Sequence, residues 1–126
     1  PLYKPPYSRI TAIDMTTGEH LWWIPVGETP ARVLQHPQLK DMELPNAGTG
    51  RTPPMAVTPT MLMYASTTSD GTPHLFAIDK RSGEELARVE VPADSYYGMM
   101  TYVHEGRQYV MLQTGSRLTA IALPQQ

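Results

Sequence analysis

The side chains that most often carry enzymatic chemistry are few and scattered in this sequence. The four histidines show no metal-ligand spacing such as His-x-x-x-His; they are His20, His36, His74 and His104. Cysteine is absent, which excludes disulfides, thiolate catalysis and cysteine metal sites. No Gly-x-Ser-x-Gly motif, which would hold a serine nucleophile on a sharp turn, occurs. The sequence therefore predicts no catalytic residue and no metal site.

Composition narrows the class of protein. The length of 126 residues fits one domain, here taken as residues 1–126. Charged residues make up 17% and the net charge is −2, so there is no basic field for nucleic acid. No apolar run approaches the ~20 residues that span a bilayer. The opening "PLYKPPY" is no signal peptide, so we expect a processed chain or a piece of a longer one.

Short apolar or alternating runs, each ended by turn residues, recur along the chain and predict an all-β fold without long helices. "TMLMYA" is apolar on both faces, as in a strand covered on both sides, and "EELARVEV" alternates, as in an outer strand with one wet face. The methionines of the late strands are expected to pack in the core rather than bind a soft metal; they are Met99, Met100 and Met111. The nine predicted strands cover 8–14, 19–26, 54–58, 60–67, 74–79, 84–91, 98–105, 107–114 and 117–123.

Two of the predicted turns share one chemistry. Asp14 and Asp79 end strands where a carboxylate can accept the backbone N–H groups of the next residues. Gly18 and Gly83 supply the positive φ that closes a short hairpin with a bulge. An aspartate in this Asp-x-x-Thr/Ser-Gly context indicates a turn rather than a catalytic acid.

These turns belong to a repeat. "AIDMTTGEHL" at 12–21 matches "AIDKRSGEEL" at 77–86, and a partial third copy, "LTAIAL", lies 43 residues after the second. A spacing near 43 residues is the length of a β-propeller blade, a four-stranded antiparallel sheet. The sequence predicts a partial propeller of about two blades, with a partial blade at 8–26, a long loop at 27–53, a complete blade at 54–91 and a partial blade at 98–123.

The loops that join an outer strand to the next inner strand gather near a propeller's axis, where ligands bind. Weak candidates for cofactor or ligand contacts on these axial loops are Arg51, Tyr96, Tyr97 and Thr114. Packing of the aromatic side chains is the alternative interpretation.

Asp-x-x-Thr-Gly-x-x-x-Trp after an apolar strand, here "AIDMTTGEHLW", resembles the tryptophan-docking repeat of quinoprotein dehydrogenases. Those enzymes are eight-bladed propellers that use pyrroloquinoline quinone (PQQ). The order of the other motifs, from a Pro-Pro-Tyr lead-in through "MTY" and "EGRQYVM" to "TAIALP", is similar to the C-terminal part of the glucose-dehydrogenase-like branch. The resemblance implies PQQ and calcium as cofactors of the family, a periplasmic location, and a structural role for Trp22, packed against the neighbouring blade.

The chain departs from the family pattern at a docking tryptophan and at the loop that covers the family's active site. Ala87 stands where the second docking tryptophan would be, and the Gly-rich, His-bearing loop that overhangs the family's active site shrinks to "QTGSR" at 113–117. The family's catalytic aspartate, calcium ligands and most quinone contacts lie on earlier blades. No catalytic residue is therefore carried over, and PQQ and calcium are not expected to bind this chain alone.

Two functions remain open. The chain contributes scaffold blades to a PQQ-dependent dehydrogenase, or it is a stand-alone structural or ligand-binding module that assembles by oligomerisation. In either case we expect partners, which are the other blades of a parent enzyme or further copies of the chain, because strands 8–26 and 98–123 leave sheet edges open. The strand "EHLWWIPV" could complete the last blade of its own chain or that of a second copy.

Overall fold

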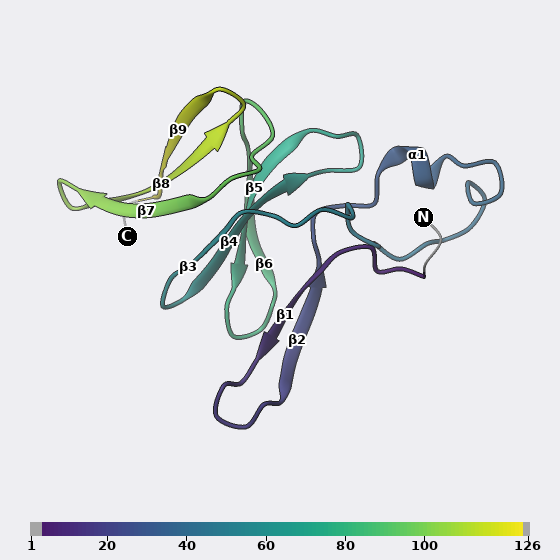
Figure 1. Cartoon of the computed structure of the whole chain (residues 1–126), viewed down its shortest axis with the longest axis horizontal. Helices are drawn as coiled ribbons and strands as arrows, with labels where there is room; N and C mark the ends of the chain where they lie inside the picture. The colour runs from purple at the N-terminus through teal and green to yellow at the C-terminus, as the bar shows by residue number, and fades with distance from the viewer. Residues whose placement is uncertain (1–3, 125–126) are drawn as a thin grey trace.

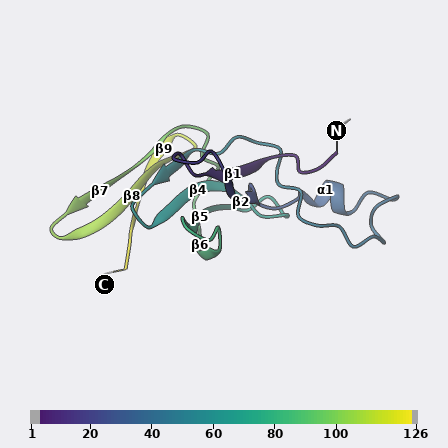
Figure 2. The ribbon, with the colours of Figure 1, turned by 90° about the horizontal axis from the view of Figure 1, so that it is seen from below.

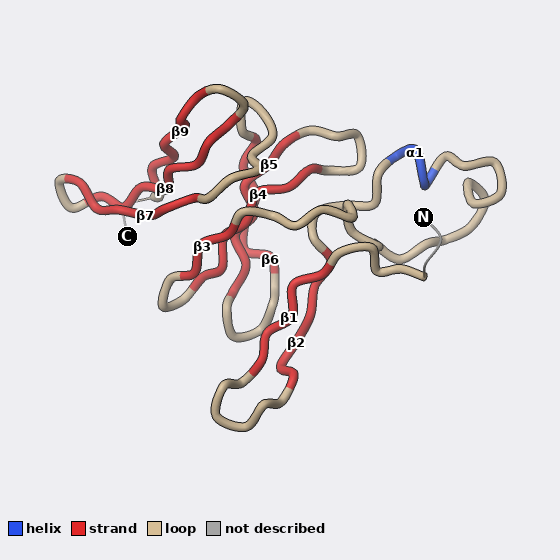
Figure 3. The backbone as a smooth tube through the Cα atoms, in the orientation of Figure 1, coloured by secondary structure: helices blue, strands red, loops and turns tan. Residues whose placement is uncertain are grey.

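The structure is a computed structural model that describes residues 4–124. Within that range, nine strands form three antiparallel sheets, each built from strands consecutive in sequence (Figures 1 and 3). The first sheet pairs β1 (Arg9–Ile13) with β2 (His20–Pro25). The central sheet has the order β3 (Met55–Val57), β4 (Met61–Thr67), β5 (Pro73–Asp79), β6 (Glu85–Glu90). The third sheet has the order β7 (Met99–His104), β8 (Arg107–Thr114), β9 (Arg117–Ala122).

The β1–β2 and β5–β6 turns have the same construction. Asp14 Oδ1 accepts hydrogen bonds from the backbone N–H groups two and three residues further on, at 2.7 and 3.2 Å. Asp79 Oδ1 accepts the equivalent pair at 2.8 Å each. Gly18 and Gly83 both have φ 77°, a conformation that strains any residue with a Cβ. A bulge before each aspartate, at Ala12/Ile13 and Ala77/Ile78, completes the turn.

The central sheet is covered on both faces, as the apolar character of both faces of β4 predicts. One buried cluster joins it to the third sheet and contains Met63, Ala65, Leu75, Val91, Val110 and Leu112. The other joins it to the β1–β2 hairpin and contains Val26, Leu62, Tyr64, Phe76 and Ile78, with Ile10, Trp22 and Ile24 packed against it. Alternate side chains of one strand therefore enter two different cores, which is the arrangement of stacked propeller blades.

The long connection from β2 to β3 lies at the end of the sheets opposite the aspartate turns (Figure 1). Its first residues run beside the β4–β5 turn, with hydrogen bonds from Glu28 N to Thr67 O (3.0 Å) and from Ala31 N to Ser69 O (2.7 Å). The β6–β7 connection meets the β8–β9 turn through Gly115 N and Asp94 O at 3.1 Å. In both orthogonal views the part of the long connection around α1 extends away from the sheets (Figure 2).

The long connection contains one helical turn, α1 (Ala31–Leu34), which is too short to leave a helical period in the sequence and leaves the fold all-β. Two expectations about local structure are wrong. Strand β6 is exposed along its whole length rather than on one face, because the third sheet has no fourth strand among residues 4–124 to lie opposite it. Met100 is 54% exposed, since no described sheet covers the outer face of β7–β9.

The sequence predicts that the strand "EHLWWIPV" completes the last blade either of its own chain or of a second copy. The first of these does not occur among the described residues. Strand β2 pairs only with β1 among the described residues, and β9 pairs only with β8, so the chain does not close its own last blade.

Candidate functional site

Trp22 packs between the β1–β2 hairpin and the central sheet, at the end of the sheets where the aspartate turns lie. Its side chain is half-buried, and its Nε1–H donates a hydrogen bond to Lys80 O at 3.1 Å. A Cβ built on Gly83 would lie 2.8 Å from Cδ2 of the indole, closer than real Cβ contacts. The ring therefore covers the β5–β6 turn of the next sheet. Trp23 lies on the opposite face of β2 and is 52% exposed.

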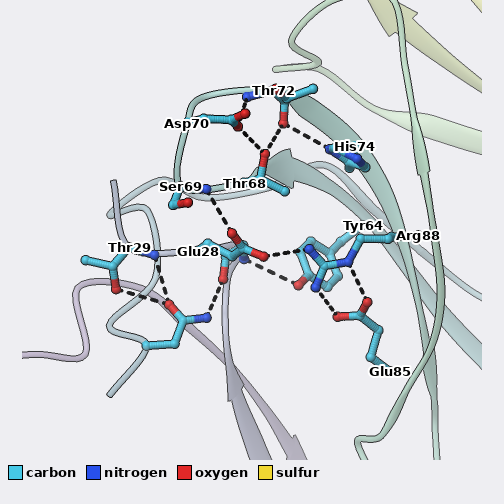
Figure 4. Close-up of polar contacts among 12 residues, drawn as sticks. Glu28, Thr29, Tyr64, Thr68, Ser69, Asp70, Thr72, His74, Glu85 and Arg88 are labelled. Atoms are coloured by element: carbon cyan, nitrogen blue, oxygen red, sulfur yellow. Dashed lines mark hydrogen bonds and ion pairs between the residues drawn. The ribbon is translucent and has the colours of Figure 1, made fainter. Parts of the chain in front are cut away.

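A network of charged groups holds the other end of the same junction (Figure 4). Arg88 Nη1, on β6, donates to Glu28 Oε1 at 2.6 Å, while its Nε and Nη2 donate to the Glu85 carboxylate at 2.7 and 3.0 Å. Ser69 N donates to the second oxygen of Glu28 at 2.9 Å. The hydrogen bond from Arg88 holds the pKa of Glu28 below its ordinary value, and the two carboxylates raise the pKa of Arg88. The long connection is thus fastened to the central sheet by an ion pair.

Stacked rings lie beneath this network. The Tyr64 and Phe76 rings are stacked, with centroids 4.9 Å apart, and the Arg88 guanidinium lies 4.9 Å from the Phe76 centroid. Tyr64 Oη accepts a hydrogen bond from Gly27 N at 3.3 Å, and burial raises the pKa of this phenol. The pocket between the hairpin and the sheet has a volume of about 190 Å³.

A second cluster forms where the long connection meets the β6–β7 loop. Arg51 Nη1 donates to Tyr96 Oη at 3.0 Å and lies 3.4 Å from Asp94 Oδ2. The guanidinium also lies over the Tyr96 ring, 5.4 Å from its centroid. Tyr96 Oη donates to Asp94 Oδ2 at 2.6 Å, and this bond raises the pKa of the phenol.

A small pocket adjoins this cluster. Its volume is about 20 Å³, and its polar lining residues include Arg51, Asp94, Ser95 and Tyr96. Ala65 and Val91 are among its apolar lining residues. The Ser95 hydroxyl is buried without a hydrogen-bond partner among residues 4–124.

The four axial-loop candidates are placed differently. Arg51 and Tyr96 are in direct contact, whereas Tyr97 is 66% exposed. Thr114 is buried, and its hydroxyl shares a hydrogen bond of 2.5 Å with that of Thr119. The sequence reasoning did not find Asp94, Ser95 or the Glu28–Arg88 pair. Pairs such as Glu28 and Arg88, 60 residues apart, leave no spacing signal in a single sequence.

The donor groups of the described residues do not by themselves fit a PQQ–calcium site. A flat, polycarboxylate quinone needs cationic partners and a pocket of about 300 Å³ or more. The two pockets measure about 20 and 190 Å³, and the cations that line them, Arg51 and Arg88, already face carboxylates. Calcium takes six to eight oxygen ligands. No group of three His, Cys, Asp or Glu side chains suited to a metal occurs among residues 4–124.

Sheets stacked face to face, joined through a tryptophan and a Gly-containing turn, define a partial β-propeller of a few blades. A family model described as "Glucose/ethanol/alcohol dehydrogenase, beta-propeller domain", a PQQ family, matches residues 1–110. The chain belongs to this family.

Individual relatives agree with the family assignment. The chain is 29% identical over 120 residues to the quinate/shikimate dehydrogenase (quinone) of Acinetobacter baylyi, covering 91% of this chain and 14% of that protein. It is 32% identical over 114 residues to the glycerol dehydrogenase large subunit of Gluconobacter thailandicus, covering 89% and 15%. It is 29% identical over 119 residues to the quinoprotein glucose dehydrogenase of Escherichia coli, covering 91% and 14%.

The chain spans only 14–15% of the length of these curated relatives. No solved structure gives a significant match to it. Among residues 4–124, no helix is both long and apolar enough to cross a membrane.

Proposed function

We propose that this chain supplies scaffold blades to a PQQ-dependent dehydrogenase and holds no complete active site of its own. The observation that carries the proposal is the covering of the central sheet on both faces, with Trp22 joining one sheet to the turn of the next. The side chains that the repeat contributes, such as Trp22, make packing contacts between sheets. The small size of the two pockets also supports a scaffold role.

Turnover by the purified chain tests the proposal. The chain is supplied with PQQ, calcium, a dye acceptor and, in turn, glucose, glycerol or quinate, the substrates in the names of its relatives. We expect no rate above background. The quinoprotein glucose dehydrogenase of Escherichia coli, assayed in the same mixture with glucose, is the positive control. A rate from the chain that requires both calcium and PQQ would overturn the proposal.

A stand-alone, non-catalytic module that assembles by oligomerisation is the second candidate. It is favoured by apolar side chains exposed on the outer faces of the end sheets, such as Trp23 on β2 and Met100 on β7. Oligomers of the chain alone that do not take up the other blades of a relative would favour this module. Preferential binding of those blades would favour the scaffold.

We also propose a periplasmic location, which rests on membership of the PQQ family. Fractionation of cells that express the protein from its native reading frame tests this location, and recovery with cytoplasmic markers would contradict it.

A further inference from the structure

The tip of the long connection, residues 32–44, lies apart from the sheets. In both orthogonal views the part of the connection around α1 extends away from them (Figures 1 and 2). Among residues 4–124, every hydrogen bond of the tip reaches a residue at most four positions away in the same connection. The tip forms no ion pair within this range, and neither buried cluster contains one of its side chains. Because only local contacts hold the tip, it can open without disturbing the sheets.

The residues on either side of the tip are fastened to the rest of the protein. Ala31, before the tip, donates a backbone hydrogen bond to Ser69 O at 2.7 Å, in the β4–β5 turn. Thr49, after the tip, donates one to Val26 O at 2.9 Å, next to the end of β2. Each of these bonds joins a residue that precedes the tip to one that follows it. Both bonds would therefore survive a cut within the tip.

The side chain of Asn46 joins the two sides of the connection directly. Its Oδ1 accepts hydrogen bonds from Thr29 N and Gly48 N at 3.0 Å each, and from Thr29 Oγ1 at 3.2 Å. Its Nδ2 donates to Gly27 O at 2.8 Å. The Thr29 hydroxyl is buried and accepts in turn from Ala47 N at 2.7 Å. One amide side chain thus closes the base of the connection.

A buried apolar contact also bridges the two sides. The β1–β2 hairpin precedes the tip and the central sheet follows it, and the two share the cluster that contains Val26, Phe76 and Ile78. The hydrogen bond from Trp22 Nε1 to Lys80 O crosses the same junction. A cut in the tip removes none of these contacts.

We propose that the tip is a proteolytic processing site, at which an endopeptidase cuts the chain into two pieces that remain one folded protein. In this step water adds across one peptide bond: the C–N bond breaks, and a new carboxylate and a new amino group form. Exposed loop tips are the usual sites of such cuts. The two aspartate turns are less suitable, because hydrogen bonds to their aspartate side chains close them. The proposal goes beyond the scaffold role and does not depend on it.

Brief digestion of the folded chain with subtilisin tests the proposal, since the broad sequence preference of this endopeptidase lets the structure decide where it cuts. Mass spectrometry locates the first cut, and size-exclusion chromatography follows the products. We expect the first cut within residues 35–43, with both pieces eluting together at the volume of the uncut chain and separating only in urea. A first cut elsewhere, or pieces that separate without denaturant, would overturn the proposal. So would resistance of the folded chain under conditions that degrade the heat-unfolded chain.

Asn46→Ala tests whether the base of the connection keeps the pieces together. The pieces of this variant should separate at a lower urea concentration than those of the parent, because four hydrogen bonds across the cut are lost. Gln38→Ala is the matched control, since Gln38 is an exposed amide of the tip whose side chain makes no hydrogen bond to residues 4–124. Its pieces should separate at the same urea concentration as those of the parent.

Thermal melts of the uncut variants establish that each is folded before digestion. Equal urea midpoints for the cut parent and the cut Asn46→Ala variant would show that Asn46 does not hold the two sides, and would count against the proposal. None of these outcomes bears on the dehydrogenase assay, so the two proposals fail separately.

Discussion

The indole of Trp22 occupies the space that a side chain on Gly83 would need: a Cβ there would lie 2.8 Å from Trp22 Cδ2. The two residues come from different blades, and each belongs to a copy of the same repeat. Gly83 therefore has two roles, since its φ of 77° closes the β5–β6 turn and its missing side chain admits the neighbouring blade's tryptophan. Gly18, its counterpart in the first copy, has the same φ but nothing within 4 Å of its Cβ position.

This difference predicts unequal effects of one substitution. Gly18→Ala should cost about 1 kcal/mol of unfolding free energy, because the alanine is held at positive φ. Gly83→Ala should cost about 1–3 kcal/mol more, because it also displaces Trp22. Urea denaturation of the two variants measures the difference. Equal losses would show that the indole does not hold its place against the turn.

Trp22 itself should contribute more than its neighbour. Trp22→Ala removes the half-buried indole and the bond to Lys80 O, and we expect a loss of about 3 kcal/mol, at the low end for such a change because the ring is not fully buried. Trp23→Ala should cost less, since Trp23 is 52% exposed on the other face of β2. Equal or reversed losses in denaturant melts would show that Trp22 is not the residue of β2 that faces the central sheet.

The Glu28–Arg88 ion pair predicts a dependence of stability on pH. The pKa of Glu28 is lowered in the folded state, chiefly by the Arg88 hydrogen bond. Its contribution to stability is therefore present above its ordinary pKa of 4.5 and is lost as the pH falls through the folded-state value. Glu28→Gln should therefore lose less stability than the parent protein as the pH falls, when urea midpoints are compared between about pH 3 and 6.

Glu43→Gln provides the control for this titration, because Glu43 is exposed in the same long connection and makes no ion pair among residues 4–124. The control variant should lose as much stability as the parent protein when the pH falls. A Glu28→Gln profile that runs parallel to the parent would show that the ion pair does not form in solution.

The sequence predicts those features of the fold that are encoded locally. The Asp14 and Asp79 turns depend on a few consecutive residues, and the repeat supplies the order of the blades. The exposure of β6 could not be predicted, since it depends on the number of strands that the described part of the third sheet contains rather than on β6 itself.

The candidate site was harder to predict. Arg51 and Tyr96 could be proposed because their loops converge in any propeller. Their contact with Asp94, 43 residues from Arg51, depends on the path of the long connection. The unsatisfied Ser95 hydroxyl is likewise a property of packing, because a serine in a loop is ordinarily solvated.

The last prediction concerns association. Each end sheet buries one face against the central sheet and exposes apolar side chains on the other. On the hairpin these include Leu21 and Trp23, and on the third sheet they include Met100 and Leu118. Strands β1 and β9 also have one unpaired edge each among the described residues. Apolar faces next to open edges favour association through stacked or added strands.

A head-to-tail arrangement would place the outer face of the third sheet against the exposed face of a second copy's hairpin, so that sheets of two chains stack face to face as the central and third sheets do within one chain. We therefore expect oligomers by light scattering at micromolar concentration, and a clean 14.0 kDa species would contradict the prediction. Met100→Lys and Trp23→Lys should each shift the distribution toward monomer, because each places a charge in the contact. Arg81→Lys, away from both faces, should not. Loss of association in the first two variants without loss of folding would separate a specific interface from general stickiness.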